Sequence, residues 1–227
     1  ILKEQPMQSG KLPLDELEKI LSIISSKDPR VVLGPQAGED AALIDMGDRY
    51  LVATTDPITF ASDQIGWYAV HINANDIVVM GGEPRWMLSN LLIPGGTSIK
   101  AVEDIFKQLK MACDELNIAI IGGHTEFVAD LARPIITGIM LGEVPKGNEV
   151  RTSAAQIDDS ILLTKSIPIE GCAILASEAT DDLLASGVNK EIIQAGKMLL
   201  KDPGNSVVPE ARIAISTGKI NAMHDPT

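Results

Sequence analysis

The fold of this chain is decided by the stretch Tyr68-Ala-Val-His-Ile-Asn-Ala-Asn-Asp-Ile-Val-Val-Met80. Its spacing predicts a helix in which Asp76 shares a face with Ala69, Ile72 and Met80. An ionised carboxylate is disfavoured there, because burial removes its water and the C-terminal end of a helix repels anions. An unpaired buried ion costs on the order of several kcal/mol. A metal ion held by Asp76 and other acidic residues is the simplest remedy.

The patterns on both sides of this helix predict an α/β (α+β) chain. Pro13 opens a helix with apolar residues at helical spacing as far as Ile24. Ser98 can cap a second long helix, whose apolar face would cover a sheet. The expected strands are 41–45, 50–55, 86–93, 118–121 and 135–141, and the two expected long helices are 65–80 and 99–116.

A domain boundary is expected where the sequence changes to Pro145-Lys-Gly-Asn-Glu149. We therefore predict an N-terminal domain over 1–147 and the start of a C-terminal α/β domain over 148–227. The second domain is expected to be incomplete, because the sequence stops in a turn directly after a predicted strand. Its expected strands are 160–164 and 220–223, and its expected helices are 169–179, 189–200 and 206–217.

The composition excludes several classes of protein. With 45% hydrophobic and 22% charged residues, the chain can form real cores and is not a disordered segment. A net charge of −12 without a basic stripe argues against a nucleic-acid partner. The longest apolar runs are too short to span a membrane, and no signal-peptide pattern is present, so we expect a cytoplasmic protein. Cys113 and Cys172 are expected to be reduced core residues.

Three short motifs supply oxygen ligands at predicted strand ends and on the helix. Gly38-Glu39-Asp40 precedes one strand, and its glycine allows the backbone to approach a ligand closely. Thr54-Thr55-Asp56 ends the next strand, and Asn75-Asp76 lies on the helix. Carboxylate and hydroxyl oxygens suit Mg²⁺, particularly when phosphate oxygens complete its shell. Each motif alone is also typical of a solvated turn, so the prediction depends on their meeting in space.

A fourth motif, Gly122-Gly123-His124-Thr125-Glu126, directly follows a predicted strand. Its glycine amides and threonine hydroxyl could contact phosphate, although it could equally be a tight turn. For His124 we favour phosphate or loop contact over metal ligation, with an acid or base role open. The chain has neither a Walker loop nor a Gly-x-Gly-x-x-Gly fingerprint. It also lacks a Gly-x-Ser-x-Gly elbow, which argues against a covalent hydrolase.

In their order along the chain, these motifs and the segment Asn75-Asp-Ile-Val-Val-Met-Gly-Gly-Glu-Pro84 resemble the aminoimidazole ribonucleotide synthetase (PurM-like) superfamily. Within it, the likeness is greatest to HypE-like hydrogenase-maturation proteins. The resemblance extends to Met223-His-Asp-Pro-Thr227, which looks like the start of a glycine-rich segment.

The resemblance implies a two-domain PurM-like architecture, whose N-terminal mixed sheet is covered by helices and pairs in a homodimer. It also implies bound ATP and Mg²⁺. Asp40, Asp56 and Asp76 match the metal-binding carboxylates, with Glu39 as a further candidate ligand. The positions that match phosphate contacts are Gly122, Gly123 and Thr125, and Gly38, Thr54, Thr55 and Asn75 belong to the same ATP-binding motifs.

This sequence also departs from the superfamily pattern. HypE and the thiamine-monophosphate kinases usually carry an aspartate where this chain has His124, and Glu126 is a candidate replacement. No N-terminal cysteine is present, which argues against selenophosphate synthetase. HypE proper ends in a cysteine that carries the thiocarbamate, and these residues hold no such terminus.

The leading hypothesis is an ATP-dependent, Mg²⁺-requiring HypE-like enzyme that phosphorylates a carbamoyl-type oxygen and promotes dehydration. Asp40, Asp76 and His124 are its candidate catalytic residues, and a carbamoylated protein is a candidate partner. Two alternatives remain open. One is a small-molecule kinase or ligase similar to thiamine-monophosphate kinase, and the other is a nucleotide-binding maturation scaffold without turnover.

Overall fold

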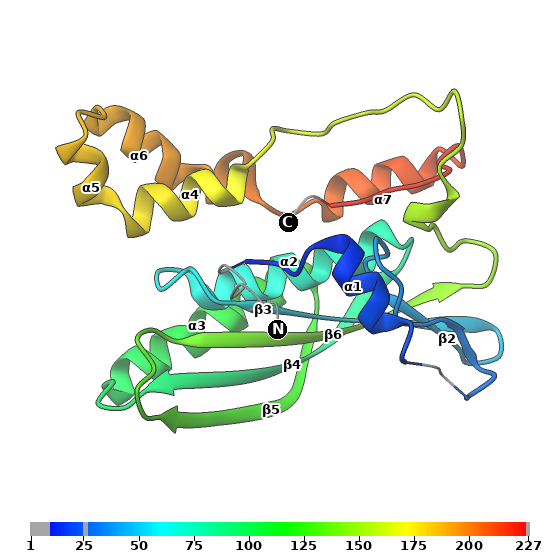
Figure 1. Cartoon of the computed structure of the whole chain (residues 1–227), viewed down its shortest axis with the longest axis horizontal. Helices are drawn as coiled ribbons and strands as arrows, with labels where there is room; N and C mark the ends of the chain where they lie inside the picture. Colours follow the sequence, from blue (N-terminus) through cyan, green and yellow to red (C-terminus); the bar gives the residue numbers. More distant parts are fainter. Residues whose placement is uncertain (1–9, 25–26, 226–227) are drawn as a thin grey trace, which may run out of the picture.

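A computed structural model of the chain describes residues 10–24 and 27–225. Its centre is one six-stranded mixed sheet in the order β1-β2-β3-β6-β4-β5, in which only the β4–β5 pair is parallel. The strands are β1 (Val31–Leu33), β2 (Ala42–Asp45), β3 (Arg49–Ile58), β4 (Glu83–Pro94), β5 (Ala119–Val128) and β6 (Ile135–Pro145). Figure 1 shows the sheet below and the helices above it.

Two long helices, α2 (Ile65–Val79) and α3 (Ile99–Leu116), cover one face of the sheet (Figure 1). The C-terminal helices lie on the far side of α2, so α2 is enclosed on all sides and nearly all its residues are buried. This differs from the single apolar stripe expected for this helix. A helix that is buried all round has no solvated face, which explains why His71, Asn73, Asn75 and Asp76 are all inside the protein.

The α2 helix approaches the sheet closely at Gly138 of β6. A Cβ at this position would lie 2.3 Å from Nδ2 of Asn73 and 3.1 Å from the carbonyl oxygen of Ala69. No side chain fits in that space, so glycine allows the helix backbone to rest directly on the middle of the sheet.

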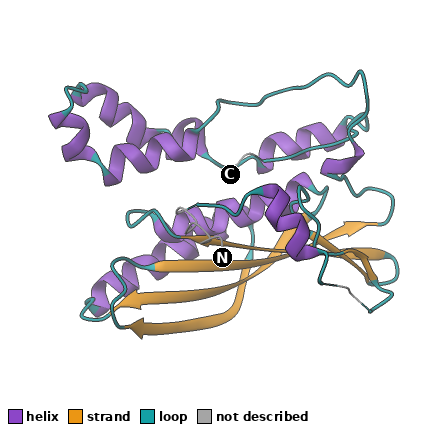
Figure 2. Ribbon diagram, in the orientation of Figure 1, coloured by secondary structure: helices purple, strands orange, loops and turns teal. Residues whose placement is uncertain are grey.

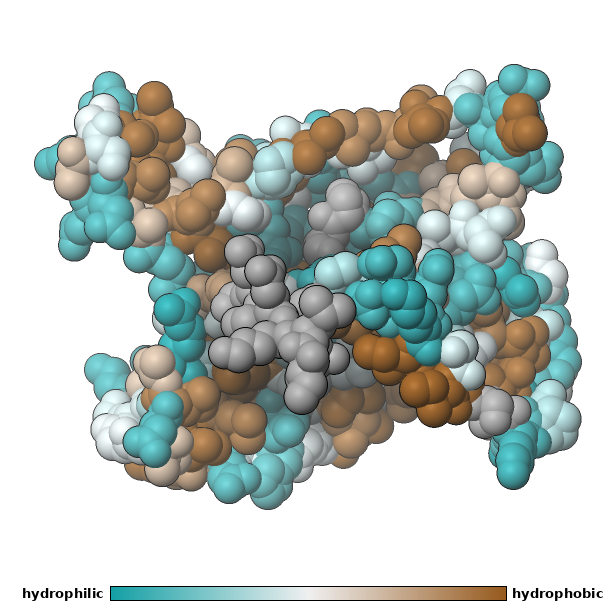
Figure 3. All heavy atoms as spheres, viewed as in Figure 1, coloured by the Kyte–Doolittle hydropathy of each residue, from teal (hydrophilic) through white to brown (hydrophobic). Residues whose placement is uncertain are grey.

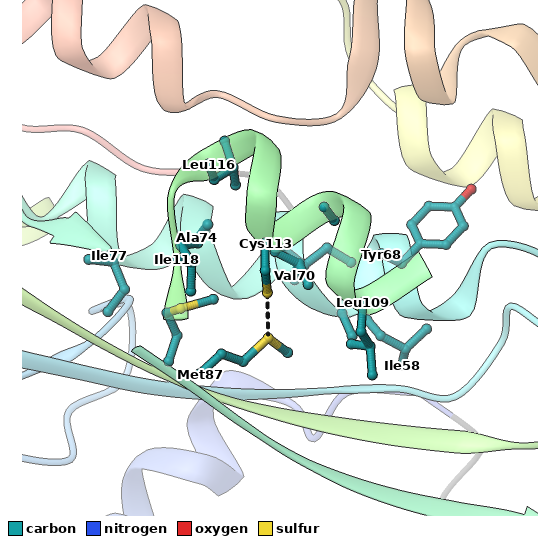
Figure 4. Packing of buried hydrophobic residues seen from close by; sticks show 14 of the residues in the cluster. Ile58, Tyr68, Val70, Ala74, Ile77, Met87, Leu109, Cys113, Leu116 and Ile118 are labelled. Carbon is teal, nitrogen blue, oxygen red and sulfur yellow. Dashed lines mark hydrogen bonds between the residues drawn. The ribbon is translucent and has the colours of Figure 1, made fainter. Parts of the chain in front are cut away.

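The α3 helix begins and ends as the sequence predicts. The Ser98 hydroxyl accepts a hydrogen bond from the amide of Ala101, and Asn117 ends the helix in the left-handed region. Its apolar face packs on the sheet, where Cys113 Sγ lies 3.8 Å from Met87 Sδ (Figure 4). The expectation of a buried Cys113 is thus confirmed, whereas the same expectation for Cys172 is wrong because its side chain is exposed.

The remaining helices lie before and after the sheet region: α1 (Leu14–Leu21), α4 (Ile169–Glu178), α5 (Thr180–Ala185), α6 (Lys190–Met198) and α7 (Val208–Ser216). Figure 2 shows that the described part beyond β6 contains helices and loops but no strand. The strands expected at 160–164 and 220–223 are therefore wrong, and α5 was not expected. The mixed α/β class and the helix-covered sheet are confirmed.

The failed strand over 160–164 is an extended segment without a neighbouring strand. Ile161 is 96% exposed and Leu162 is 84% exposed. This segment runs along the upper edge of the molecule, where apolar atoms are visible in Figure 3. A strand requires a hydrogen-bonding partner, which β-branched residues alone do not provide. Across the described residues, no helix is long and apolar enough to cross a membrane.

Candidate functional site

Asp40, Asp56 and Asp76 converge from three different elements. Asp40 precedes β2, Asp56 lies near the end of β3, and Asp76 lies on α2. Thr54 joins two of them: its Oγ1 lies 2.6 Å from Oδ2 of Asp76 and 3.1 Å from the backbone carbonyl oxygen of Asp40. The structure thus brings the three acidic motifs of the sequence to one place.

The carboxyl group of Asp76 is the most strongly perturbed in this cluster. Burial raises its pKa to about 9, and the negative charges of Asp56, Asp225 and Asp40 act in the same direction. The hydrogen bond from Thr54 opposes this shift without cancelling it. At neutral pH Asp76 therefore carries a proton unless a cation takes the proton's place.

Asp56 is fixed to α2 through its backbone. Its amide donates to Oδ1 of Asn73 at 2.9 Å, while Nδ2 of Asn73 donates to the Asp56 carbonyl at 3.3 Å. Burial raises the pKa of the Asp56 carboxyl group, and the positive charge of Lys11 lowers it. Because Asn73 bonds both the amide and the carbonyl of Asp56, the Asp56 side chain projects from a fixed backbone position, and its negative charge raises the pKa of Asp76.

Asp40 contacts residues from the C-terminal part of the chain. Its Oδ1 lies 2.8 Å from Nδ1 of His224, and its Oδ2 accepts a hydrogen bond from the hydroxyl of Thr152 at 2.9 Å. Burial raises the pKa of Asp40, although His224 and Thr152 favour its ionised form. Asp225 is 3% exposed and joins Asp40 and His224 in a group whose ligand atoms all lie within 4.8 Å of one another.

The other residues of these motifs have structural contacts of their own. Glu39 accepts hydrogen bonds from the amides of Thr152 and Ser153, both at 3.2 Å. Asn75 contacts the segment before α7, because its amide group bonds the carbonyl of Asn205 and the amide of Val207. Gly38 and Thr55, the other two residues of these motifs, lie nearby. Gly38 adopts a left-handed φ of 86° in the loop before Asp40, and the hydroxyl of Thr55 donates to the Gly138 carbonyl.

The Gly122–Glu126 motif is not the loop that the sequence predicts, because it forms the middle of β5, an edge strand. At Gly123 a Cβ would lie 2.0 Å from the carbonyl oxygen of Ser89, so only glycine permits this close pairing with β4. Parallel pairing with β4 thus overrides the turn preference of the two glycines.

This strand position separates the fourth motif from the acidic cluster. The sheet register runs from Asp56 through Gly138 and Ser89 to Gly123, which is three strand spacings of about 4.8 Å. His124, Thr125 and Glu126 are exposed on this edge, and His124 Nε2 lies 3.4 Å from Oε2 of Glu126. Within one copy of the chain, these residues do not join Asp40, Asp56 and Asp76.

Several members of the cluster were not expected from the sequence. They are Thr152, His224, Asp225 and Glu170 at the start of α4, and the pKa of Glu170 is raised to about 7 by burial and by the charges of Asp225 and Asp56. Oε2 of Glu170 has no hydrogen-bond partner among the described residues. Only the His-Asp pair at 224–225 gave a local signal, since the other two lie in ordinary polar surroundings in the sequence.

A cavity of about 930 Å³ adjoins the acidic cluster. Its polar wall includes Asn75, Thr152, Glu170, His224 and Asp225, and its apolar wall includes 161–163. Small-molecule sites typically combine an apolar lining with a few convergent polar groups and occupy roughly 300–1,000 Å³. The arrangement can therefore hold a ligand of nucleotide size next to a cluster of carboxylates.

Comparison with known proteins identifies the family. Residues 38–144 match the family described as AIR synthase related protein, N-terminal domain. A hydrogenase expression/formation protein of Methanocaldococcus jannaschii is 30% identical over 200 residues, which cover 86% of this chain and 56% of the relative. The carbamoyl dehydratase HypE of Rhizobium leguminosarum is 26% identical over 74% of this chain and 53% of its own length.

A thiamine-monophosphate kinase of Archaeoglobus fulgidus is also similar, with 26% identity over 59% of this chain and 45% of the kinase. This chain therefore spans about half the length of the curated relatives that it matches.

Solved structures agree on the fold. AaThiL complexed with AMPPCP and TMP aligns with a TM-score of 0.70 at 20% identity, covering 94% of this chain and 67% of that structure. The hydrogenase maturation protein HypE in complex with ATP aligns with a TM-score of 0.53 at 25% identity, covering 68% of this chain and 47% of HypE. Residues 38–144 therefore belong to the AIR synthase related family, the relatives of the chain are members of the AIR synthase superfamily, and the solved structures show that the chain shares the PurM-like fold.

Proposed function

We propose that this chain binds ATP with Mg²⁺ and acts as a HypE-like hydrogenase maturation factor that phosphorylates a carbamoyl-type oxygen and promotes dehydration. The observation that carries the proposal is the convergence of Asp40, Asp56 and Asp76 beside the 930 Å³ cavity. The similarity to a carbamoyl dehydratase and to a HypE structure described with ATP supports the choice of substrate and nucleotide.

The acidic cluster fits a divalent cation. Burial and the negative charge of Asp225 raise the pKa values of Asp40, Asp56 and Asp76, so their ionised forms are costly without added positive charge. We expect Asp40, Asp56, Asp76 and Asp225 to hold Mg²⁺, with Glu39 as a more distant candidate. When bound, Mg²⁺ neutralises the triphosphate and orients it.

The other polar groups of the site are proposed to orient the carboxylates or to exchange protons. Thr54 and Thr152 each direct a hydroxyl at a carboxylate, which favours the ionised form that a cation requires. Glu170 has a pKa near neutrality and lines the cavity, so it is our candidate to accept the proton that a carbamoyl group loses during dehydration.

The proposed phosphate contacts of Gly122, Gly123 and Thr125, and the roles of His124 and Glu126, require a second copy of the chain. The edge strand β5 carries exposed apolar side chains, with Ile120 at 44%, Ile121 at 53% and Phe127 at 49%. An exposed apolar edge is a template for pairing with another chain. We therefore propose a homodimer in the cytoplasm that brings β5 of one copy toward the nucleotide of the other.

Two alternatives use the same site. A kinase similar to thiamine-monophosphate kinase would transfer the phosphoryl group to a small molecule, in line with the kinase relative. A scaffold would bind nucleotide without turnover, which the substitution of the usual aspartate by His124 favours. ADP formation separates the classes: a carbamoylated peptide should stimulate the dehydratase, thiamine monophosphate should stimulate the kinase, and neither should stimulate the scaffold.

The test of the proposed site is calorimetric binding of a non-hydrolysable ATP analogue with Mg²⁺. Asp76→Asn keeps the size of the side chain and removes its charge, so we expect at least a ~10-fold weaker metal-dependent affinity, about 1.4 kcal/mol. Asp104→Asn is the matched control, because Asp104 pairs with Lys107 on the exposed side of α3. Unchanged affinity in the folded Asp76→Asn variant would exclude the site.

A further inference from the structure

One part of the acidic cluster contains a nitrogen ligand as well as oxygen ligands. Asp40, His224 and Asp225 each present one ligand atom, and these atoms all lie within 4.8 Å of one another. The other carboxylates near this group, Asp56 and Asp76, come from β3 and α2 and offer only oxygen. The chain therefore places an imidazole at one side of an otherwise carboxylate site.

The spacing of the two atoms suits a shared metal ion. Nδ1 of His224 lies 2.8 Å from Oδ1 of Asp40. Two ligands bound at right angles to one cation, each at about 2.1 Å, lie about 3.0 Å apart. Only a small shift would therefore turn this hydrogen-bonded pair into two adjacent ligands.

Thr152 lies between Asp40 and the backbone that carries His224. Its hydroxyl lies 2.9 Å from Oδ2 of Asp40 and 3.0 Å from the carbonyl oxygen of Met223, the residue before His224. The single hydroxyl proton serves one of these acceptors at a time. Outer contacts of this kind orient ligands and tune the affinity of a metal site.

The exposure of the three side chains also suits the entry of a cation from the cavity. The Asp40 side chain is 7% exposed and the His224 side chain is 53% exposed, while Asp225 as a whole is 3% exposed. His224 and Asp225 thus line the cavity, whereas Asp40 is not among its lining residues. A cation that entered from the cavity would meet nitrogen on one side and oxygen on the other.

We infer that His224 supplies a nitrogen ligand to a divalent cation that Asp40 and Asp225 also hold, so that this position prefers a transition-metal ion such as Mn²⁺ to Mg²⁺. The inference rests on the proposed function, because Asp40 belongs to the proposed ATP site. Mg²⁺ favours an all-oxygen shell, whereas imidazole suits first-row transition metals. Asp56 and Asp76 remain the oxygen-only part of the cluster.

The test is electron paramagnetic resonance with Mn²⁺ alone as the probe, on the whole chain. Spin-echo modulation should report one histidine nitrogen bound to Mn²⁺ in the unmodified protein, and labelling histidine with a heavy nitrogen isotope should change that modulation. In His224→Gln the modulation should disappear, and Mn²⁺ affinity should fall about 10-fold or more. Mg²⁺ affinity, measured by competition, should stay within about twofold, since nitrogen contributes little to Mg²⁺ binding.

Lys219→Gln is the matched control, because Lys219 lines the same cavity without belonging to the cluster. It should retain the nitrogen signal. Bound Mn²⁺ without nitrogen modulation in the unmodified protein overturns the inference, and if Asp76→Asn still weakens ATP binding, the proposed function survives. Absence of Mn²⁺ binding, with or without the ATP analogue, overturns both. The labelled unmodified protein gives the answer even if His224→Gln does not fold.

Discussion

The hydroxyl of Thr54 on β3 lies 2.6 Å from a carboxylate oxygen of Asp76 on α2. This contact joins the sheet to the helix at the place where the charge is most costly, because burial raises the pKa of Asp76 to about 9. Thr54 is therefore the residue that most directly favours an ionised Asp76.

Replacing Thr54 by valine should weaken cation binding. Valine has a similar volume but no hydroxyl, so the pKa of Asp76 should rise further and fewer molecules should carry the ionised form at pH 7. A hydrogen bond to a charged group is worth about 1.5–3 kcal/mol, so metal affinity should fall about 10-fold or more. Thr54→Ser retains the hydroxyl and should restore binding. Equal affinities for the valine and serine variants, measured by calorimetry, would contradict this role.

Without a divalent cation, the protein should become less stable as the pH rises. Asp76 binds its proton more tightly in the folded state than in the unfolded state, and burial also raises the pKa values of Asp40 and Asp56. The stabilisation is complete below the unfolded pKa near 4 and is lost as the pH approaches about 9. Thermal unfolding between about pH 7 and 9, above the range in which the lowered pKa of His71 acts in the opposite direction, should show a falling melting temperature. Asp76→Asn should flatten the profile, and an equally steep profile in that variant would assign the effect to other groups.

Gly138→Ala should destabilise the fold. The added methyl group would lie 2.3 Å from Nδ2 of Asn73, so α2 would have to move and the Asn73 contacts with Asp56 would weaken. Overpacking of this kind typically costs about 1–3 kcal/mol, which urea unfolding can measure. Gly171→Ala in α4 is the control, because its nearest neighbour is 3.8 Å away and alanine favours a helix. A neutral Gly138→Ala would mean that α2 does not rest closely on β6.

Ile121→Lys should disrupt the proposed dimer. Ile121 is 53% exposed on the edge strand β5, and a lysine at a strand edge opposes pairing with another chain. Sedimentation velocity should show monomers for this variant and dimers for the unmodified chain. Ile192→Lys makes the same change at a 64% exposed position on α6 and should leave the dimer intact. Monomers of the unmodified chain would contradict the dimer directly.

The sequence predicted the elements whose patterns are local. The helix expected at 65–80 is α2 (Ile65–Val79), and the helix expected at 99–116 is α3, since both have long apolar patterns with clear ends. Segment 160–164 reads as a strand but finds no neighbour, and Gly122–Glu126 reads as a turn but pairs with β4. In both cases the outcome depends on a strand elsewhere in the chain, which a local pattern does not contain.

Part of the candidate site could be predicted from local sequence patterns, and part of it could not. The meeting of Asp40, Asp56 and Asp76 could be expected, because each flanks a predicted strand or interrupts the apolar face of a predicted helix. Thr152 and Glu170 could not, since each reaches the cluster from more than a hundred residues away from Asp40 and lies in an unremarkable polar sequence. Only the folded chain gives them a carboxylate as a neighbour.

Glu39, in the predicted N-terminal part of the chain, accepts hydrogen bonds from the amides of Thr152 and Ser153 in the predicted C-terminal part. The charges of the two parts therefore act on one another. The part beyond residue 147 brings amide dipoles to Glu39 and contributes Asp225, so it partly relieves one negative charge while it adds another. The N-terminal part expressed by itself would therefore have a different set of ligands, with Glu39 released and Asp225 missing. A shortened chain that keeps the sheet intact would still lose part of the charge pattern of the proposed cation site.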